Sequence, residues 1–340
     1  MSPQRLLVVI PCLNEAKHLP VLLDALCADP AAADARIIVA DGGSTDGSAE
    51  IVRERAKANP RVALLDNPKR IQSAGVNLAV RVHGAGAELL VRIDAHAAYP
   101  DDFLSQLLDA QAKSSADSVT VSMRAAANTR SCFQRAVAAA QNSVLGAGGS
   151  PHRKRGERRW VEHGHHALFK LAAFRSVGGY DESFTHNEDA EFDARLAGSG
   201  GRILLAADIV IDYFPRADAR SLWRQYFMHG RGRARTTTKH ASRLRLRQLA
   251  PIAIAPAVAL ALFAPWAPWA AAPAAVWLAG CLAFGAWLGV REGEPCAGAA
   301  GVPAAIMHLA WSLGFLREYI ARIGQAPAST DKNERKQVEI

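Results

Sequence analysis

The chain has 340 residues, of which 50% are hydrophobic and 21% are charged. A chain of this length holds one large α/β domain with additional elements, and this apolar fraction excludes a disordered protein. The five cysteines follow none of the short spacings of zinc sites or disulfide frameworks, so the sequence indicates neither, and a reducing cytosolic setting fits. Because the sequence opens without the segments of a signal peptide, we expect residues 1–240 to stay in the cytosol.

The net charge of +8 is concentrated in residues 216–247, which hold ten basic residues and one acidic residue, a net charge of +9. A long apolar stretch begins at Ala250. A basic segment beside an apolar one is typical of a chain that meets anionic lipid headgroups. No nucleic-acid-binding module accompanies the charge, so we expect a membrane and no nucleic acid as partner.

The first hundred residues alternate between two kinds of pattern. Short runs rich in leucine and β-branched residues predict buried strands at residues 5–11, 36–40, 62–65 and 88–93. Apolar residues at helical spacing predict helices at residues 19–26, 44–57 and 71–82. Strands that alternate with helices predict right-handed crossovers and a doubly wound, mostly parallel sheet.

The next hundred residues are less regular. The Gly-rich, basic residues 146–159 predict a loop, and loose alternation predicts a strand at residues 161–170. The sequence Gly-Gly-Tyr-Asp at 178–181 marks a turn, and residues 188–196 have helical spacing.

The stretch from Ala250 to Val290 has 41 residues without Lys, Arg, Asp or Glu, whereas a spanning helix needs about 20 residues. We therefore expect two spans. The middle of the stretch predicts a hairpin turn, because prolines interrupt it there, with aromatic residues at the far interface. These residues are Pro265, Trp266, Pro268, Trp269 and Pro273. The entry would be held on the cytosolic side by Arg243, Arg245 and Arg247.

A third apolar stretch at residues 297–316 is long enough to span, but it contains Pro303 and His308 and is followed by basic residues. An interfacial position is therefore equally open for it. The alternative for the whole region is a buried helical subdomain.

Short polar motifs lie at the ends of the predicted strands or at the start of a helix. They are PCLNE at 11–15, DGGSTDG at 41–47, DAH at 94–96 and ED at 188–189. Because the carboxyl ends of parallel strands meet at one edge of a sheet, we expect these motifs to converge. A nucleotide sugar requires a base pocket, a divalent cation against its diphosphate and a general base for the acceptor hydroxyl. The sequence offers candidates for all three.

On the nucleotide side, Asp41 is expected to accept a hydrogen bond from a uracil or ribose donor, with Pro11, Asn14 and Glu15 on the neighbouring loop. The alternative is that Asp41 only shapes a turn. For Asp46 we expect the structural role of a helix cap.

On the diphosphate side, Asp94 and His96 supply a carboxylate and an imidazole that suit Mn²⁺ or Mg²⁺, although a single Asp-x-His is common by chance. Glu188 and Asp189 begin an acidic helix. In one interpretation they complement the helix dipole, and in the other Asp189 faces the sugar and removes a proton.

Strand alternation places His163 and His165 on one face and His166 on the other, which disfavours a three-histidine metal site. His165 and His166 are instead candidates to line an acceptor pocket. A candidate clamp for a diphosphate is formed by Gln225, Arg231 and Arg233, and general attraction to lipid headgroups is the alternative.

Taken together, these motifs resemble the family-2 inverting glycosyltransferases with a GT-A fold, over residues 6–235. The resemblance rests on VVIPCLNE, IIVADGGSTDGS, RIQSAGVNLAV, VRIDAHAAYP, FRSVGGYDESF and HNEDAEFDARL. The DAH form of the usual DxD motif, with GSPHR, GHHALF and RQYFMHGRGRAR, is similar to a membrane-associated subgroup of exopolysaccharide glucosyltransferases of succinoglycan type.

The resemblance implies a Rossmann-like GT-A catalytic domain and a helical transmembrane region. It implies a UDP-hexose as donor, a polyprenyl-diphosphate-linked saccharide as acceptor, and Mn²⁺ or Mg²⁺ as cofactor. Asp189, with Glu188, would act as the catalytic base of an inverting displacement, and Asp94 with His96 would hold the metal. The donor would be bound by Pro11, Asn14, Glu15, Asp41, Arg70, Asn77 and Asp94.

We therefore predict a catalytic domain at 1–240, a basic segment at 241–249, membrane helices at 250–320 and a polar tail at 321–340. The protein would lie on the inner membrane with its catalytic domain facing the cytoplasm. Transfer to a polyprenyl monophosphate, or a membrane protein that senses nucleotide sugars without turnover, are the alternatives. A dehydrogenase is excluded because no GxGxxG follows the first strand.

Overall fold

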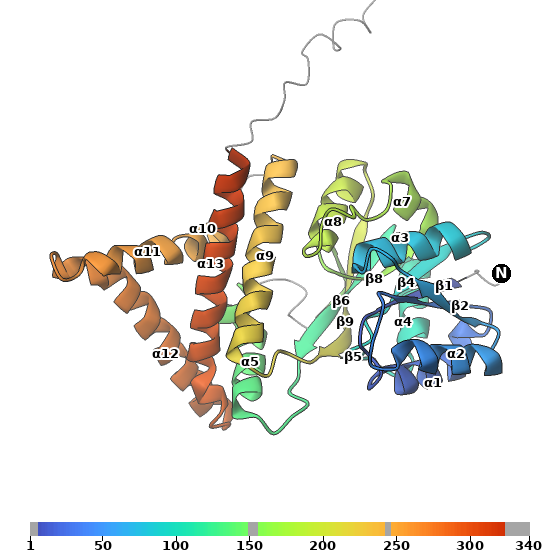
Figure 1. Cartoon of the computed structure of the whole chain (residues 1–340), viewed down its shortest axis with the longest axis horizontal. Coiled ribbons are helices and arrows are strands. Elements are labelled where there is room, and N and C mark those ends of the chain that lie inside the picture. The colour runs from blue at the N-terminus through green and yellow to red at the C-terminus, as the bar shows by residue number, and fades with distance from the viewer. Residues whose placement is uncertain (1–5, 149–155, 242–245, 324–340) are drawn as a thin grey trace, which may run out of the picture.

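The computed structural model describes residues 6–148, 156–241 and 246–323. A mixed β-sheet with helices on both faces forms one part of the molecule, and a group of long helices lies beside it (Figure 1). Within the described residues the sheet has nine strands, in the order β3-β2-β1-β4-β8-β6-β9-β5, and β7 pairs with β9. The strands are β1 (Leu6–Cys12), β2 (Arg36–Asp41), β3 (Val62–Asp66), β4 (Leu89–Arg92), β5 (Ala97–Ala98), β6 (Ser118–Ala125), β7 (Arg159–Val161), β8 (His165–Lys170) and β9 (Ile203–Tyr213).

Helices α1 to α8 lie in the part of the described chain that forms the sheet, and the sequence predicted four of them, α1 to α3 and α8. The helices of this part are α1 (Leu19–Ala28), α2 (Ser48–Ala58), α3 (Gln72–His83), α4 (Phe103–Ser114), α5 (Cys132–Asn142), α6 (Val144–Ala147), α7 (Leu171–Ser176) and α8 (Glu188–Gly198). A short 3-10 turn, η1 (Pro30–Ala32), follows α1. The four strands and three helices predicted in the first hundred residues are confirmed, with ends that differ by a few residues.

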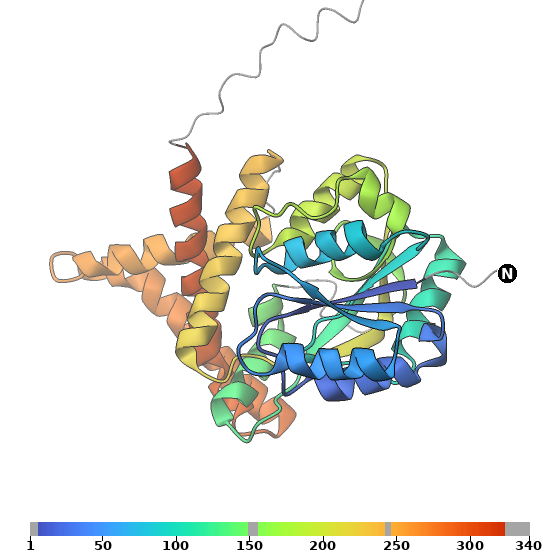
Figure 2. The same cartoon turned by 45° about the vertical axis from the view of Figure 1, so that its right-hand side comes forward.

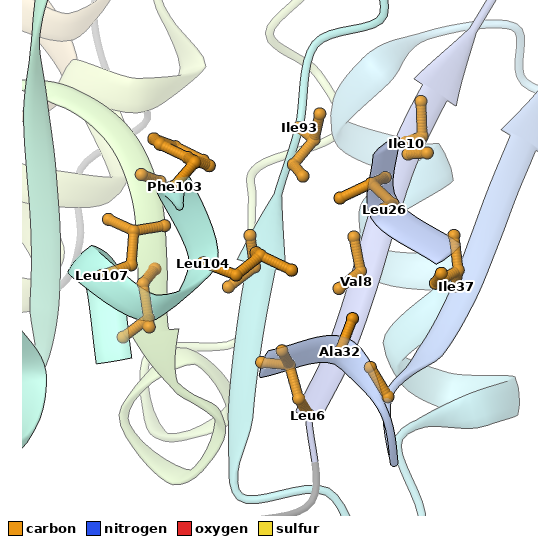
Figure 3. Close-up of a cluster of buried hydrophobic side chains, with 14 of the residues drawn as sticks. Leu6, Val8, Ile10, Leu26, Ala32, Ile37, Ile93, Phe103, Leu104 and Leu107 are labelled. Atoms are coloured by element: carbon orange, nitrogen blue, oxygen red, sulfur yellow. The ribbon is translucent and has the colours of Figure 1, made fainter. Parts of the chain in front are cut away.

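Alternate residues of β1 build the two faces of the core. Leu6, Val8 and Ile10 point toward α1 and α4, where Figure 3 shows them among Leu26, Ile37, Phe103, Leu104 and Leu107. The residues between them, Leu7 and Val9, pack on the opposite face against α3, α7 and α8. A strand buried on both faces is the reason why its sequence is a continuous apolar run.

The sheet differs from a purely parallel one because β8 is inserted between β4 and β6. It runs antiparallel to both neighbours, and Val91 pairs with Leu168. The predicted strand at 161–170 is split, since β7 ends at Val161 and β8 begins at His165. This register brings the start of β8 beside the end of β4, where the DAH motif follows.

The remaining helices form the C-terminal part of the described chain. They are α9 (Ala219–Lys239), α10 (Leu246–Ile252), α11 (Ile254–Leu260), α12 (Ala272–Glu292) and α13 (Gly301–Ile323), with short 3-10 turns η3 (Ala261–Phe263), η4 (Pro268–Ala271) and η5 (Ala297–Ala300). Helices α9 and α13 lie side by side, while α11 and α12 form a hairpin that projects away from the sheet (Figures 1 and 2).

The structure corrects the expectation of two full-length spans between residues 250 and 290. Among the described residues, two helices are long and apolar enough to cross a membrane, at Pro268–Glu292 and Ala297–Ile323. The first expected span is instead a shorter apolar helix, Leu249–Phe263. At about 1.5 Å per residue it is shorter than the hydrocarbon core of a bilayer, which is about 30 Å thick. The predicted turn is present, and Trp266 and Trp269 at its tip are 81% and 71% exposed.

A second correction concerns the cysteines. Cys132 at the start of α5 and Cys296 beside η5 form a disulfide across 164 residues of sequence. No spacing rule finds such a pair, because only the packing of α5 against η5 brings the two ends together. Apolar residues around the bond support the same contact: Val137, Ala140, Leu288, Ala297 and Ala300.

Candidate active site

The loops after β1 and β2 are tied together by side-chain hydrogen bonds. The backbone N–H of Asn14 donates to Ser44 Oγ at 2.8 Å, and its side-chain Oδ1 accepts from the N–H of Thr45 at 2.8 Å. The N–H of Glu15 donates to Ser48 Oγ at 2.8 Å. Asn14 adopts a positive φ of 58°, which asparagine tolerates better than most residues. The PCLNE and DGGSTDG motifs therefore form one rigid surface at the sheet edge.

Asp41 and Asp46 shape this surface. Asp41 is 6% exposed, and its carboxylate accepts from the N–H groups of Gly43 and Ser44, both at 3.0 Å. Asp46 accepts from the N–H groups of Ala16 at 2.9 Å and Ser48 at 3.1 Å. Asp46 is not the cap that was expected, because Gly47 is the N-cap of α2, but its bonds to Ala16 and Ser48 still give it a structural role. Asp41 closes a turn, which is the alternative role considered for it. It also lies at the edge of the sheet where β1 and β2 end.

Two residues assigned to the donor from the RIQSAGVNLAV motif lie in different settings. Arg70 is exposed and packs its guanidinium over Gly43, on the tied loops. The buried amide of Asn77 donates to Tyr180 O at 2.8 Å and Glu182 Oε1 at 3.0 Å, and accepts from the N–H of Tyr180 at 2.9 Å. Asn77 therefore supports the Gly-Gly-Tyr-Asp turn and stands apart from the tied loops.

The tied loops meet the DAH motif through one contact. His96 Nδ1 lies 2.9 Å from Glu15 Oε1, and this hydrogen bond raises the pKa of His96 above its ordinary value. The imidazole is half exposed. Glu15 and His96, which were assigned to different subsites, are thus neighbours.

Arg92, which sequence reasoning missed, connects the acidic residues of the site. Its side chain is 4% exposed and reaches Asp189 Oδ1 at 2.6 Å, Asp94 Oδ1 at 3.3 Å and Tyr180 Oη at 3.2 Å. Burial opposes the charged form of Arg92, but Asp189 and Asp94 outweigh it and raise its pKa well above the ordinary value. A basic residue inside an otherwise apolar buried strand requires acidic partners. That rule is the signal by which the sequence could have revealed it.

Asp94 is held by the residues around the end of β4. Its backbone N–H donates to Tyr99 Oη at 2.8 Å, its Oδ1 accepts from Gln72 Nε2 at 3.0 Å, and its Oδ2 lies 3.7 Å from His165 Nε2. Burial raises its pKa, but Arg92 and the two histidines lower it more, so the carboxylate is ionised. Burial also lowers the pKa of His165 to about 4, which makes this imidazole neutral.

Asp94 is the side chain of the DAH motif that suits a divalent cation. Within the described residues, no group of three His, Cys, Asp or Glu side chains surrounds one point. Mg²⁺ and ions like it are commonly held by one or two carboxylates together with substrate phosphates, and the ionised carboxylate of Asp94 matches that arrangement. His96 binds a metal only as a neutral imidazole, whereas its contact with Glu15 favours the charged form.

Glu188 and Asp189 begin α8 behind Asn187, whose φ of 64° turns the chain into the helix. Burial and the neighbouring Asp189 carboxylate raise the pKa of Glu188 to about 7. Burial also acts against ionised Asp189, but Arg92 and His166 lower its pKa well below the ordinary value. Two adjacent carboxylates with opposite shifts are typical of acid–base chemistry.

The three histidines are arranged differently from the prediction. His163 and His166 share Asp193 on α8, with His163 Nδ1 at 2.8 Å from Oδ2 and His166 Nε2 at 2.7 Å from Oδ1. The predicted alternation is wrong because β8 begins only at His165, and Gly164 packs directly against Thr120. His166 is 1% exposed and does not line an open pocket, whereas His165 lies at Asp94.

The residues expected to clamp a diphosphate all lie on α9 but not on one face. Gln225 donates to Tyr213 Oη at 2.7 Å, and Arg231 Nε pairs with Glu318 Oε2 of α13 at 2.9 Å. Since successive helical residues are rotated by about 100°, Arg231 and Arg233 lie on nearly opposite sides of the helix. These three side chains therefore do not converge on one group.

A mixed sheet of this topology, with Glu15, Asp94 and His96 after its strands and Asp189 at the start of α8, has the arrangement of a GT-A fold. The fold is similar to that of the mannosyltransferase PcManGT from Pyrobaculum calidifontis, solved in complex with GDP-Man and Mn²⁺. The TM-score is 0.53 at 23% identity, over 90% of this chain and 87% of that one.

The chain belongs to glycosyltransferase family 2. A model described as "Glycosyl transferase family 2" matches residues 7–178, half of the sequence. The chain is 50% identical to the succinoglycan biosynthesis protein ExoA of Rhizobium meliloti over 314 residues, which covers 92% of this chain and 94% of the relative. A shorter match, 34% identical over 110 residues, links it to polyprenol monophosphomannose synthase of Mycolicibacterium smegmatis, over 32% of this chain and 41% of that protein.

Proposed function

We propose that this glycosyltransferase moves a hexose from a UDP-sugar to a polyprenyl-diphosphate-linked saccharide in exopolysaccharide synthesis. UDP-glucose is the first donor to test. The observation that carries the proposal is the contact of Arg92 with both Asp94 and Asp189. It joins the motif expected at the diphosphate to the residue expected at the acceptor hydroxyl. The similarity to ExoA over nearly the whole chain supports the biosynthetic setting.

The donor nucleotide would lie on the tied loops. Pro11, Asn14 and Glu15 would form one wall, and Asp41 would hold the turn against which the base and ribose rest. Arg70, exposed over Gly43, would meet the nucleotide from the other side. A divalent cation held by Asp94 would offset the negative charge of the diphosphate.

The proposed chemistry is a single displacement with inversion. The acceptor oxygen attacks the anomeric carbon, the bond from that carbon to the diphosphate oxygen breaks, and UDP leaves with the electron pair. Asp189 receives the proton of the acceptor hydroxyl. Arg92 keeps Asp189 in the ionised form that a base requires, although the same contact lowers its proton affinity, and Glu188, whose pKa burial raises to about 7, lies beside it as the second carboxyl group.

A lipid-linked acceptor fits the C-terminal part of the molecule. The hairpin of α11 and α12 exposes large apolar side chains, among them Phe263, Trp266 and Val276. Membrane insertion of this hairpin would place the active site near the bilayer surface, where a polyprenyl chain keeps its head group. His165, which lies beside Asp94, would then contact the head group. The cationic residues of α9 would contact it separately, and not together as the three-residue clamp that the sequence predicted.

The test is a transfer assay with defined acceptors. Purified protein with Mn²⁺ or Mg²⁺ is given UDP-glucose, UDP-galactose or GDP-mannose, and either polyprenyl phosphate or a polyprenyl-diphosphate-linked sugar. We expect metal-dependent UDP release and label in the lipid phase only with the diphosphate-linked acceptor. Label in polyprenyl phosphate would instead favour the monophosphate transferase that the match to polyprenol monophosphomannose synthase raises. Nucleotide binding without turnover would favour a sensor.

The assay also tests the base. Asp189→Asn is expected to lower kcat by about 10³-fold, since general-base catalysis contributes about 10²- to 10⁴-fold. UDP binding measured by calorimetry should stay within about twofold. Turnover at the native rate would remove Asp189 from the proposal.

The proposed cytoplasmic orientation at the inner membrane has its own test in the cysteine pair. A reducing compartment keeps thiols free, whereas the structure pairs Cys132 with Cys296, so the orientation and the disulfide are in conflict. A cytoplasmic orientation requires that alkylation in intact cells label both cysteines. Cys27, a partly buried free thiol, serves as the labelling control. A fully oxidised pair in intact cells would overturn the cytoplasmic orientation.

A further inference from the structure

A buried histidine bridges two acidic residues of one helix. Asp189 and Asp193 are four residues apart on α8 and therefore lie one above the other on the same face. His166 of β8 places Nε2 at 2.7 Å from Asp193 Oδ1 and Nδ1 at 3.3 Å from Asp189 Oδ1. Nδ1 is also 2.8 Å from Tyr180 Oη. Both ring nitrogens thus face oxygen atoms.

The side chains that form this bridge are buried. The side chains of His166 and Asp193 are 0% and 1% exposed. Asp193 Oδ2 is also occupied, because it accepts from His163 at 2.8 Å and from the N–H of Gly164 at 3.2 Å. Burial disfavours the charged form of His166, but Asp193, Tyr180 and Asp189 raise its pKa well above the ordinary value. The geometry accommodates an imidazolium whose Nε2 donates to Asp193 and whose Nδ1 donates to Tyr180 Oη, with Asp189 Oδ1 as a longer ion-pair contact of the same nitrogen.

The bridge leaves the Asp189 carboxylate with two unlike oxygens. Oδ1 accepts from Arg92 at 2.6 Å and meets His166 at 3.3 Å. Oδ2 has no such contact among the described residues, and the side chain is 19% exposed. The charged and titratable groups around Asp189 are Arg92, Asp94, His165, His166, Tyr180 and Glu188.

We propose that His166, fixed by Asp193, is a positioning residue that holds Asp189 with Oδ1 turned inward and Oδ2 presented to the acceptor hydroxyl. The inference rests on the proposed role of Asp189 as base. It extends that role to two buried residues that touch neither substrate. Arg92 alone would fix one oxygen but not the rotation of the carboxylate, and a second positive charge from a different direction supplies that restraint.

The test compares three variants in the transfer assay. His166→Gln and Asp193→Asn remove the charge of the bridge while preserving size. His163→Gln is the matched control, because His163 contacts the other oxygen of the same carboxylate, Asp193 Oδ2, whereas His166 contacts Oδ1. We expect kcat to fall about 100-fold in the first two, as a displacement of about 1 Å at a reacting group does, with the KM for the donor within about twofold. The control should keep kcat within about threefold.

A spectroscopic measurement separates positioning from general support of the core. In protein labelled with ¹⁵N-histidine, His166 should give an imidazolium signal with two protonated nitrogens that persists from pH 6 to pH 8. Asp193→Asn should abolish it, and His163→Gln should keep it. If His166→Gln fails to fold, Asp193→Asn and this signal decide the question.

The outcomes separate the inference from the proposed function. An inactive Asp189→Asn together with a His166→Gln of native kcat would leave the base in place and overturn the positioning role. Equal losses in His166→Gln and His163→Gln, or a neutral His166 at pH 7, would overturn it as well. Native turnover in Asp189→Asn would overturn the base first and the positioning role with it.

Discussion

Helices α12 and α13 have similar lengths and similar apolar composition, but α13 is buried within the protein to a greater extent than α12. Only 17% of the most apolar window of the first is buried, against 50% for the second. The difference comes from small residues at one interface. Gly314 of α13 faces the backbone of Phe227, and Gly230 of α9 faces the backbone of Trp311, so the two helices approach closely. Hydropathy alone therefore identifies apolar helices, and glycines that face another backbone identify where each helix has a protein partner. In α12 such glycines, Gly285 and Gly289, lie only in its C-terminal half.

The largest expected effect breaks the α9–α13 contact. In Gly314→Val the new side chain would meet the carbonyl of Phe227, and overpacking of this kind costs about 3 kcal/mol. We expect a large fall in the thermal unfolding midpoint of the purified protein. Gly280→Val on α12 is the control, because nothing lies within 4 Å of that position. Equal midpoints in the two variants would show that α13 does not depend on this contact.

The second effect tests the bare face of the hairpin. Val276 on α12 and Val21 on α1 are similarly exposed, at 72% and 75%. A lysine in the hydrocarbon core costs about 2.5–3.5 kcal/mol, so Val276→Lys should weaken binding to phosphatidylethanolamine–phosphatidylglycerol vesicles by about 100-fold in flotation assays. Val21→Lys should leave binding unchanged. A hairpin outside the bilayer would give the two variants the same affinity.

The smallest effect concerns the charges between the two packed helices. Glu318 of α13 pairs with Arg231 at 2.9 Å and with Arg235 at 3.7 Å. These side chains are partly exposed, so Glu318→Gln should lower the free energy of unfolding by about 1 kcal/mol at most, measured in denaturant. Glu292→Gln, at the exposed end of α12, should change it by less. A loss several times larger would mean that the ion pairs, not the glycines, hold α13 in place.

The four parallel strands β1 to β4 could be predicted from the sequence because each is an apolar run followed by a polar loop, whereas β6 and β9, which also pair in parallel, were not predicted. Residues 5–11 and 36–40 are such runs. The antiparallel β8 could not be placed, because its partners β4 and β6 are distant in sequence and nothing local selects between them. The turn around Trp266 was predictable from its prolines, whereas the break of the first expected span around Pro251 was overlooked.

The sequence predicted the acidic residues of the candidate site but not the contacts between them. The motifs identified Asp94 and Asp189, since carboxylates at strand ends and helix starts stand out. Arg92, Tyr180 and Asp193 escaped notice because each makes its contacts across elements far apart in the sequence. The disulfide was missed for the same physical reason. Local patterns reveal which residues carry charge, and only the fold reveals which charges meet.

Helix α9 carries two glycines that face different neighbours. Gly230 lies against α13, and Gly232 lies against His186 and Asn187, the two residues just before Glu188. Asn187 also donates to Thr236 Oγ1 of α9 at 3.0 Å. Only the width of one helix therefore separates the apolar helix α13 from the start of α8. A displacement of α13 is therefore expected to reach the carboxylates of α8 through α9.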